Sequence, residues 1–370
     1  MERSEEINLR IPGPTPLPPL VRQATSQQMI NHRGLEFQSL LREVTNGLRP
    51  VFQTTGDILL FSASGTGGME ACVANTVSPG DKVIVVSIGA FGDRFAQIAE
   101  VYRCQVVRLS FPWGQAADPE AILRELRSHP DCRVVFVTHN ETSTGITNDL
   151  QAIGTAVRSL GEKAPLLVVD AISSLGAIEL PMDEWGCDLV LTASQKAWMS
   201  PPGLAMIGVG PRAWAYAARA TSPRLYFDFA TTQRIAQEGY TPFTPAVSIL
   251  YGLRAALKMM AQEGLPNVYA RHHHLGRKMR QGLCGLGFKL VADDAHASDT
   301  VTAAYLPAGY SSGEWLERMS RDHGIILGDG QGSLKGKIFR VAHLGYVTDE
   351  DIDHVLAAAE ALLREGPKNR

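Results

Sequence analysis

The chain has 370 residues, of which 45% are hydrophobic and 20% are charged, and this balance is typical of a folded globular protein. The formal net charge is −3, which excludes the strongly basic surface that nucleic-acid-binding proteins use, so we predict no nucleic-acid partner. The length predicts two or three domains with room for a large core.

Cysteine usage and hydropathy narrow the cellular setting. The five cysteines are an odd number and none follow a C-x-x-C spacing, which indicates a reducing compartment and no structural metal. The first ten residues, MERSEEINLR, lack the apolar segment of a signal peptide. No stretch approaches the roughly 18 apolar residues of a membrane helix. We therefore predict a cytoplasmic protein with no bound metal and no membrane association.

The chain begins with a proline-rich segment, IPGPTPLPPLV, at residues 11–21. Proline fixes φ and lacks a donor, so this segment is neither a regular helix nor a central strand. We predict that residues 1–20 form an extended N-terminal arm.

From about residue 38 to residue 250, apolar strand patterns alternate with helical patterns. Each apolar run is followed by a turn or helix signal; the runs are ILLFSAS, KVIVVS, VVFVTH, LLVVDA and LVLTAS. Near-continuous apolar strands that alternate with helices predict a mostly parallel sheet covered on both faces. We predict a large α/β domain at residues 21–255.

The C-terminal part of the chain, from about residue 248, lacks the regular alternation of strand and helix patterns. Helical patterns occupy about 248–286, two segments (TVTAAYLP and KIFRVAHLG) read as strands, and the chain closes on a helix for which Asp349 is the expected N-cap. We predict a smaller α+β domain at residues 256–370. Three consecutive histidines, His272 to His274, lie in a helical pattern, where they point about 100° apart and cannot converge on one ion, so we predict that they lie on a helix surface.

The first motif with chemical potential is SASGTGGMEA at residues 62–71, where a strand ends and a helix starts. Backbone N–H groups at such a helix start bind anions, and the hydroxyls of Ser64 and Thr66 would assist. The motif lacks the Gly-Lys-Ser/Thr of a Walker loop, and Glu70 replaces the third glycine of a dinucleotide loop. The alternative is a glycine-rich turn that binds nothing.

Two further polar residues end apolar strands. Asp170 in LLVVDAISSLG needs a partner, because a buried carboxylate is costly; the alternatives are a helix cap or a weak Walker-B-like metal ligand. Lys196 in SQKAW would have a lowered pKa if it is withdrawn from water, which favours a neutral, nucleophilic amine. The alternative for this lysine is a side chain that reaches solvent.

Together, an anion cradle, a strand-end carboxylate and a strand-end lysine match the three polar groups of pyridoxal 5′-phosphate. These are its phosphate, its basic ring nitrogen and its aldehyde. Phe91, in IGAFGDRF, is available to cover the face of the ring, although simple core packing would also explain it.

The sequence resembles the class V aminotransferases, and within them the alanine–glyoxylate and serine–glyoxylate group. The resemblance covers nearly the whole chain through PGPTPLPP, INHRGLEF, SASGTGGMEA, FGDRF, THNETSTG, VVDAISSLGA, SQKAWMSPPG, TPFTPAVS and KIFRVAHLGY. It implies the aspartate-aminotransferase-like fold of pyridoxal-phosphate-dependent transferases, with a sheet of the seven-stranded type. It also implies a pyridoxal 5′-phosphate cofactor.

The resemblance also assigns roles around the cofactor. Lys196 corresponds to the lysine that bonds to the aldehyde and moves the proton, and Asp170 to the partner of the ring nitrogen. Ser64, Gly65 and Thr66 would hold the phosphate with Gln195 beside them. Phe91 stands where many relatives carry a tryptophan stacked on the ring, and Thr142 matches a hydroxyl residue near the phenolic oxygen, with an ordinary turn threonine as the alternative.

Other residues correspond to the substrate pocket and a partner subunit. Arg340 resembles the arginine that binds the substrate α-carboxylate, although on a half-exposed strand it could simply face water. The backbone near Gly13 would close the same pocket. Thr241 and Thr244 match a loop that reaches the phosphate of the neighbouring subunit, and some relatives carry tyrosine where Thr241 stands. This implies a homodimer with shared active sites.

The implied reaction is a ping-pong transamination of a small amino acid, alanine or serine, with a 2-oxo acid, glyoxylate or pyruvate. Aspartate and broad specificity remain open. Rival readings are cysteine desulfuration, kynurenine hydrolysis, or an accessory subunit of a soluble hydrogenase. A desulfurase normally needs a reactive cysteine on a mobile loop, whereas Cys284 reads as helical and packed, and the scattered cysteines fit no iron–sulfur spacing.

Overall fold

The computed structural model describes residues 7–367, and its central feature is a seven-stranded sheet of order β2–β10–β9–β8–β5–β3–β4. Neighbouring strands pair in parallel, except that β10 runs antiparallel to both β2 and β9. The strands are β2 (Asp57–Phe61), β3 (Lys82–Ser87), β4 (Gln105–Ser110), β5 (Val134–Thr138), β8 (Leu166–Asp170), β9 (Leu189–Ala193) and β10 (Ala205–Val209). The predicted mostly parallel sheet is confirmed.

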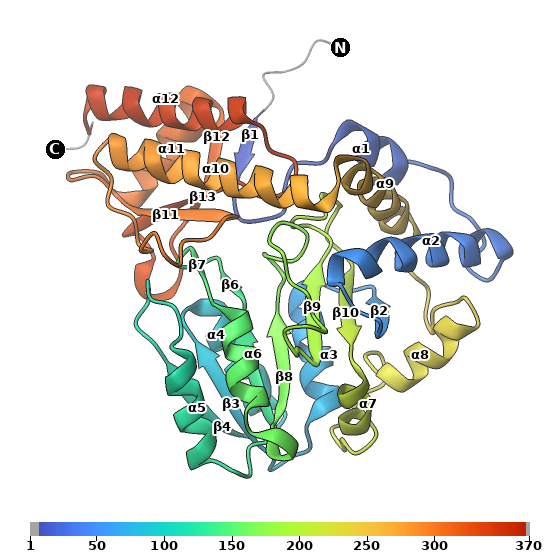
Figure 1. Ribbon diagram of the computed structural model, residues 1–370. Coiled ribbons are helices and arrows are strands. Elements are labelled where there is room, and N and C mark those ends of the chain that lie inside the picture. Colours follow the sequence, from blue (N-terminus) through green and yellow to red (C-terminus); the bar gives the residue numbers. More distant parts are fainter. Residues whose placement is uncertain (1–6, 368–370) are drawn as a thin grey trace.

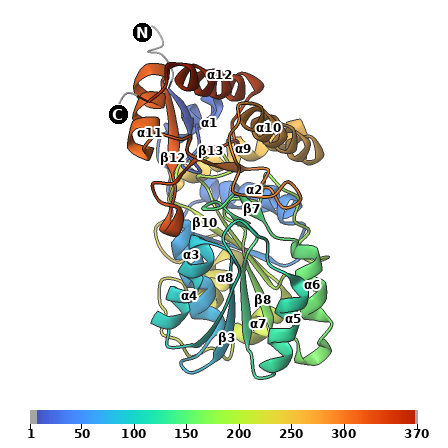
Figure 2. The same ribbon diagram turned by 90° about the vertical axis from the view of Figure 1, so that its left-hand side faces the viewer.

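Helices cover both faces of this sheet, and Figure 2 shows α3 and α4 on one side of it and α5 and α6 on the other. The helices of the first side are α3 (Gly65–Thr76), α4 (Ala90–Val101), α7 (Pro211–Ala217) and α8 (Phe229–Gln237). Those of the second side are α2 (Leu35–Phe52), α5 (Pro119–Ser128), α6 (Leu150–Arg158) and α9 (Val247–Glu263).

The near-continuous apolar strands follow from this three-layer arrangement. Side chains alternate along a strand, so in β5 Val134 and Phe136 enter the core under α3 and α4, while Val135 and Val137 enter the opposite core. Both faces are therefore apolar, and the polar residues are left to the strand ends.

A second, four-stranded sheet of order β1–β12–β13–β11 lies beyond one end of the large sheet (Figure 1). Its strands are β1 (Asn8–Arg10), β11 (Val301–Tyr305), β12 (Ile325–Asp329) and β13 (Ile338–Ala342). Its helices are α10 (Leu265–Gly285), α11 (Ser312–His323) and α12 (Asp349–Glu365). In Figure 1 the blue β1 stands among orange and red strands, because it pairs in parallel with β12. The smaller α+β region therefore contains both ends of the described chain.

Two strands of the large sheet escaped the sequence prediction. β4 is an edge strand in which Arg108 and the polar ends interrupt the apolar run, and no residue of it is fully buried. β10 contains Gly208, which lowers the strand signal, and a Cβ there would lie 2.8 Å from Phe52 and Met182. Strand propensity is weak at an edge and at a position that only glycine fits.

The N-terminal arm contains regular structure at both of its ends. Residues 1–6 lie outside the described residues, β1 follows, and residues 11–18 are irregular, as the prolines predicted. The end of the proline-rich segment opens helix α1 (Pro19–Thr25), where a proline at the first helical position lacks only a donor that the helix does not need. The predicted boundary between 255 and 256 falls inside α9, and the division into domains stays a prediction.

The C-terminal region corrects three side-chain predictions. Thr348 caps α12 in a capping box with Asp351, so Asp349 is the first helical residue and not the cap. His272 is buried, donates from Nδ1 to the Val268 carbonyl and accepts the N–H of Gly345 at Nε2, whereas His273 and His274 lie on the surface. Cys284 is helical as predicted, but it is exposed and not packed.

Two features are absent from residues 7–367: a membrane-spanning helix and a cluster of metal-ligating side chains. No helix among them combines the length and the apolar character that crossing a bilayer requires. No group of three or more histidine, cysteine, aspartate or glutamate side chains in this range is arranged to hold a metal ion.

Candidate active site

The site lies where β2, β8 and β9 end, which is where open parallel sheets bind ligands. A cavity of about 180 Å³ opens there. It is lined by eight of the ten residues predicted to contact the cofactor: Ser64, Gly65, Thr66, Phe91, Thr142, Asp170, Gln195 and Lys196. These residues come from five separate segments of the chain, and the sheet brings them together at the C-terminal ends of its parallel strands.

The start of α3 forms the anion cradle. Ser64 is the N-cap, and its Oγ accepts the N–H of Gly67 at 3.3 Å. The N–H of Gly68 bonds to the Ser64 carbonyl, which leaves the N–H groups of Gly65 and Thr66 as the helix-start donors available to an anion. A Cβ on Gly65 would lie 2.6 Å from Ile172, so glycine is needed for the helix to approach the sheet this closely.

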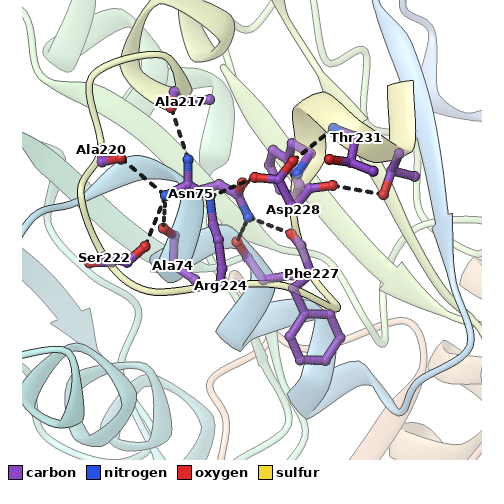
Figure 3. Close-up of polar contacts among 12 residues, drawn as sticks. Ala74, Asn75, Ala217, Ala220, Ser222, Arg224, Phe227, Asp228 and Thr231 are labelled. Carbon is purple, nitrogen blue, oxygen red and sulfur yellow. Dashed lines mark hydrogen bonds and ion pairs between the residues drawn. The ribbon is translucent and has the colours of Figure 1, made fainter. Parts of the chain in front are cut away.

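The other end of α3 is held by a polar cluster that Figure 3 shows. Arg224 donates to the carbonyls of Ala74, Ala217, Ala220 and Ser222 and pairs with Asp228. Asn75 donates to the carbonyls of Ala71 and Phe227 and accepts the N–H of Phe229. These bonds fix the segment that follows α7 against α3.

The same segment braces the turn between β2 and α3. The Tyr226 hydroxyl donates to the Ser62 carbonyl at 3.2 Å, and the Ser62 hydroxyl accepts the N–H of Ala246 at 3.1 Å. The ring of Tyr226 stacks on that of Phe243, with centroids 5.0 Å apart. The loop of residues 241–246 is therefore attached beside the cradle.

Thr241 and Thr244 are nevertheless not part of the cavity lining. Thr241 is buried and lines a separate hollow of about 420 Å³ bounded by α2, β2 and α8, and its carbonyl accepts from Arg33. Thr244 is exposed. Of the ten predicted cofactor residues, these two are the ones that the described chain does not bring to Lys196.

Asp170 ends β8 and is almost completely buried. Its Oδ1 accepts the N–H of Ile172 at 2.9 Å. Burial and the nearby Glu141 raise the pKa of Asp170, the Ile172 N–H, Lys196 and Arg94 oppose this rise, and the result is a pKa of about 7. A carboxylate with so few compensating donors fits a position opposite a protonated ring nitrogen.

Lys196 follows β9, and the loop that carries it is rigidly supported. The buried Trp198 donates from its indole to Thr192 at 2.9 Å, and Ser194 bonds to Pro201 and Leu204. Burial lowers the pKa of Lys196 to about 8, helped by Arg340 and Arg94 and opposed by Asp170. The amine is therefore partly neutral near physiological pH.

The N-terminal arm closes the cavity above this lysine. The Lys196 ammonium donates to the Pro12 carbonyl, and Thr15 bonds to the backbone of residues 195 and 196. Gly13 has φ of +116°, and a Cβ there would lie 2.6 Å from the Lys196 amine. The predicted position of Gly13 next to the reactive amine thus depends on its having no side chain.

Arg340 lies in β13 and is only 6% exposed, so it does not face water. Its Nε donates to the Asp329 carbonyl at 2.7 Å and its Nη1 to the Thr142 carbonyl at 3.0 Å. Burial lowers the pKa of Arg340, and Glu141 and Asp329 oppose this effect. The guanidinium is thus held against the backbone of Thr142, which lines the cavity, whereas Arg340 itself is not one of the lining residues.

Sequence reasoning missed four residues that line the cavity: Arg94, Asn140, Ile172 and Ser173. Arg94 follows Phe91 by three residues on α4, and its guanidinium lies 4.8 Å from the Phe91 ring centroid and 3.4 Å from the Thr66 hydroxyl. The helical i, i+3 spacing in FGDRF was the available signal.

The donor set fits pyridoxal phosphate. The cradle offers backbone N–H groups to a phosphate, Asp170 offers a buried carboxylate to a ring N–H, and Lys196 offers an amine to an aldehyde. Within residues 7–367, the Gln195 Oε1 atom is buried without a hydrogen-bond partner, and this side chain lines the same cavity. A buried amide without a partner indicates a ligand that completes its hydrogen bonding.

The chain is similar to known proteins over nearly its whole length. The family model described as "Aminotransferase class-V" matches residues 9–355. The chain is 42% identical to "Soluble hydrogenase, small subunit" of Synechococcus sp. (strain PCC 6716), over 96% of this chain and 93% of that protein. It is 37% identical to L-aspartate–glyoxylate aminotransferase of Paracoccus denitrificans (strain Pd 1222), over 96% and 90%.

Other relatives are named serine–glyoxylate aminotransferase. Among solved structures, an alanine–glyoxylate aminotransferase from Nostoc sp. superposes with a TM-score of 0.93 at 32% identity, covering 98% of this chain and 97% of that one. The chain therefore belongs to the class V aminotransferases, enzymes that depend on pyridoxal 5′-phosphate.

Proposed function

We propose that this enzyme transfers the amino group of a small amino acid, alanine or serine, to a 2-oxo acid, glyoxylate or pyruvate, by a ping-pong mechanism. The observation that carries the proposal is that Lys196 and Asp170 line one cavity, while Arg340 donates to the carbonyl of Thr142 in its wall. A base, a carboxylate and a carboxylate-binding guanidinium are the groups that transamination of an amino acid requires.

Each residue has a defined task in this proposal. Bound pyridoxal phosphate supplies the electron sink that stabilises a substrate carbanion. Arg340 binds the α-carboxylate of the substrate. Neutral Lys196 removes the α-proton and returns it at the C4′ carbon of the cofactor. Asp170 keeps a proton on the ring nitrogen, and Phe91 covers the ring face.

The remaining residues contact the phosphate, lie near the phenolic oxygen or close the cavity. Ser64, Gly65, Thr66 and Gln195 hold the phosphate, and Thr142 lies near the phenolic oxygen of the ring. Gly13 and the arm exclude water above Lys196. This exclusion strengthens the electrostatic interactions within the cavity.

The choice of amino donor rests on names of relatives. The Nostoc structure is titled an alanine–glyoxylate aminotransferase, and other relatives are named for serine or aspartate with glyoxylate. All these donors share the α-carboxylate, so Arg340 does not distinguish them. Alanine and serine remain our proposal, with aspartate as the alternative.

We also propose a homodimer with shared active sites in the cytoplasm. Thr241 and Thr244 would reach the phosphate held by the partner subunit, which accounts for their position outside the cavity of their own chain. Arg33 supports this loop by donating to the carbonyls of Thr241 and Pro242. The five cysteines are free, as expected in a reducing compartment.

A half-reaction screen tests the donor. Purified protein loaded with pyridoxal phosphate is mixed with alanine, serine or aspartate, and the loss of its visible absorbance is followed. We expect the fastest loss with alanine or serine, and its recovery with glyoxylate or pyruvate. Borohydride reduction followed by peptide mass analysis should place the cofactor on Lys196 in wild-type protein and nowhere in Lys196→Ala.

The control is Lys258→Ala, because Lys258 is an exposed lysine on α9. It should retain both the cofactor and the half-reactions. Rapid loss with aspartate alone would replace the proposed donor, and no amino-group transfer with any donor would refute the proposed reaction.

A second candidate is an accessory subunit, and the relative from Synechococcus sp. named as a soluble hydrogenase subunit favours it. This chain has all three groups expected to bind the cofactor, namely Lys196, Asp170 and the start of α3. Their presence favours an active transaminase instead. Purification from the source cell should give active protein without a stoichiometric partner. A stoichiometric partner together with no turnover would favour the accessory function, and sulfide release from cysteine would favour a desulfurase.

A further inference from the structure

The start of helix α4 is capped by a residue distant in sequence. Its N-cap, Gly89, has no side chain to accept the first helical N–H groups. Instead, Glu141 Oε2 accepts the N–H of Phe91 at 3.0 Å and that of Gly92 at 3.3 Å, and the Ser143 hydroxyl accepts the N–H of Ala90 at 3.0 Å. The three donors that normally need a cap are thus satisfied by the loop that follows β5.

Glu141 is completely buried, and its carboxylate is fully used by this arrangement. Its Oε1 accepts the N–H of Ser143 at 3.1 Å and the Ser143 hydroxyl at 2.6 Å. Burial raises the pKa of Glu141, while these bonds and those from Phe91 and Gly92 oppose the rise. The positive end of the α4 dipole also favours a negative charge at this place.

The contact between Glu141 and α4 is unusually close. A Cβ on Gly89 would lie 2.5 Å from Glu141 Cγ, 2.6 Å from its Cδ and 2.4 Å from the Ser143 hydroxyl. Glycine at position 89 is therefore required for the carboxylate to reach the helix. The geometry leaves the backbone of Phe91 little freedom to move relative to Glu141.

The same loop connects to the substrate side of the cavity. Thr142, next to Glu141, lines the cavity, and its carbonyl accepts from Arg340. Asn140, the preceding residue, donates to Ser173 and Thr300. Glu141 is thus at the centre of a segment that bonds to the backbone of Phe91, forms part of the cavity wall and accepts from Arg340.

We propose that Glu141 is a positioning residue that fixes the Phe91 ring against the cofactor by holding the Phe91 backbone N–H. This rests on the role proposed above for Phe91. Glu141 itself does not touch the cofactor in this proposal. Its effect on cofactor binding passes through Phe91, and that path can be tested.

The test is a double-mutant cycle on cofactor affinity, with Glu141→Gln, Phe91→Ala and the double variant. Glutamine keeps the shape of the side chain but places an NH₂ group where one carboxylate oxygen accepted. We expect Glu141→Gln to weaken pyridoxal phosphate binding about ten-fold and to change the visible circular dichroism of the bound cofactor. In the Phe91→Ala background the same substitution should change the affinity by less than about two-fold.

The matched control is Asp188→Asn. Asp188 is another buried carboxylate that accepts a backbone N–H, from Leu167 at 2.8 Å. It directly precedes β9, so it lies at the N-terminal end of the strand, opposite to the end that carries the cavity. The Asp188→Asn substitution should lower the melting temperature without changing the cofactor affinity or the visible circular dichroism of the bound cofactor. This separates positioning from a general loss of stability.

Three outcomes would overturn the proposal. One is unchanged affinity and circular dichroism in Glu141→Gln, another is the same ten-fold effect in the Phe91→Ala background, and the third is an equal effect of Asp188→Asn. If Glu141→Gln does not fold, Glu141→Asp is measured instead, because aspartate keeps the charge but is one methylene too short to reach both the start of α4 and Ser143. Wild-type affinity and circular dichroism in Glu141→Asp would equally overturn the proposal. Cofactor binding needs no amino acid, so the result is independent of the proposed substrates.

Discussion

The amine of Lys196 is surrounded by groups that act on its protonation in opposite directions. Burial, Arg340 and Arg94 lower its pKa, and Asp170 raises it, with the balance at about 8. Reaction with an aldehyde requires the neutral amine. The residue is thus prepared for its chemistry by its neighbours before any cofactor binds.

This predicts a pH dependence of cofactor attachment. Below its pKa the amine holds a proton and does not attack, so the rate at which apoprotein gains visible absorbance should rise with pH and level off above about 8. Arg340→Gln removes a positive neighbour, raises the pKa of Lys196 and should move the midpoint to higher pH. Arg234→Gln, an exposed arginine on α8, should leave it in place. An unchanged midpoint in Arg340→Gln would contradict the assignment.

Asp170 predicts a conflict between stability and activity. Its folded pKa of about 7 exceeds the ordinary aspartate pKa of 3.8, so the folded apoprotein binds a proton that the unfolded chain releases. Stability therefore falls as pH rises from about 4 to about 7. Asp170→Asn avoids the buried charge and should be more stable than wild type at pH 8, by about 1–2 kcal/mol, with a smaller difference at pH 5.

Thermal unfolding of the two apoproteins at both pH values checks this prediction. The same substitution should lower the transamination rate by about 10²–10⁴-fold, because the carboxylate no longer holds the ring proton. Asp294→Asn changes a carboxylate that is 94% exposed and should alter neither property. A less stable Asp170→Asn at pH 8 would contradict the electrostatic argument.

At the scale of elements, α3 shows how one helix start serves both folding and binding. Ser64→Ala removes a cap and a predicted phosphate contact, so it should cost about 1 kcal/mol of stability and also weaken cofactor binding several-fold. Ser311 caps α11 in the same way, through the N–H of Glu314 at 3.2 Å, but is not one of the residues that line the cavity. Ser311→Ala should lose only stability, and weaker cofactor binding in that variant would remove the distinction.

The N-terminal arm gives a second prediction at this scale. Gly13→Ala places a methyl group 2.6 Å from the Lys196 amine, so it should displace the lysine or the arm and slow cofactor attachment about ten-fold or more. Gly80→Ala is the matched control, because Gly80 also has positive φ, at +89°, with no atom near a new Cβ. It should lose stability through backbone strain and keep the attachment rate.

At the scale of the whole molecule, the proposed homodimer places Thr244 of one subunit at the phosphate bound by the other. Lys196→Ala and Thr244→Asp dimers should each be inactive, the second because a carboxylate repels the phosphate. A purified hybrid with one chain of each kind has one site with both defects and one with none, so it should recover about half of the wild-type activity. An inactive hybrid would show that the sites are not shared.

Several features could be predicted because they depend on local sequence. Apolar strands with polar ends predicted a mostly parallel sheet, since both faces of its strands are buried under helices. Asp170 and Lys196 stood out because charged side chains rarely follow such strands, and the family resemblance added Arg340 and Gly13. The edge strand β4, the reversed strand β10 and the pairing of β1 with β12 depend on distant partners, so local patterns missed them.

The sequence by itself determined the family, the cofactor and the candidate residues, because motif types and their order along the chain carry that information. Only the tertiary structure decided which of those residues meet. It brought five segments to one cavity, left Thr241 and Thr244 outside it, and showed Glu141 holding the start of α4. Burial, pKa and closeness of approach depend on packing between elements far apart in the chain, and no local pattern of residues records them.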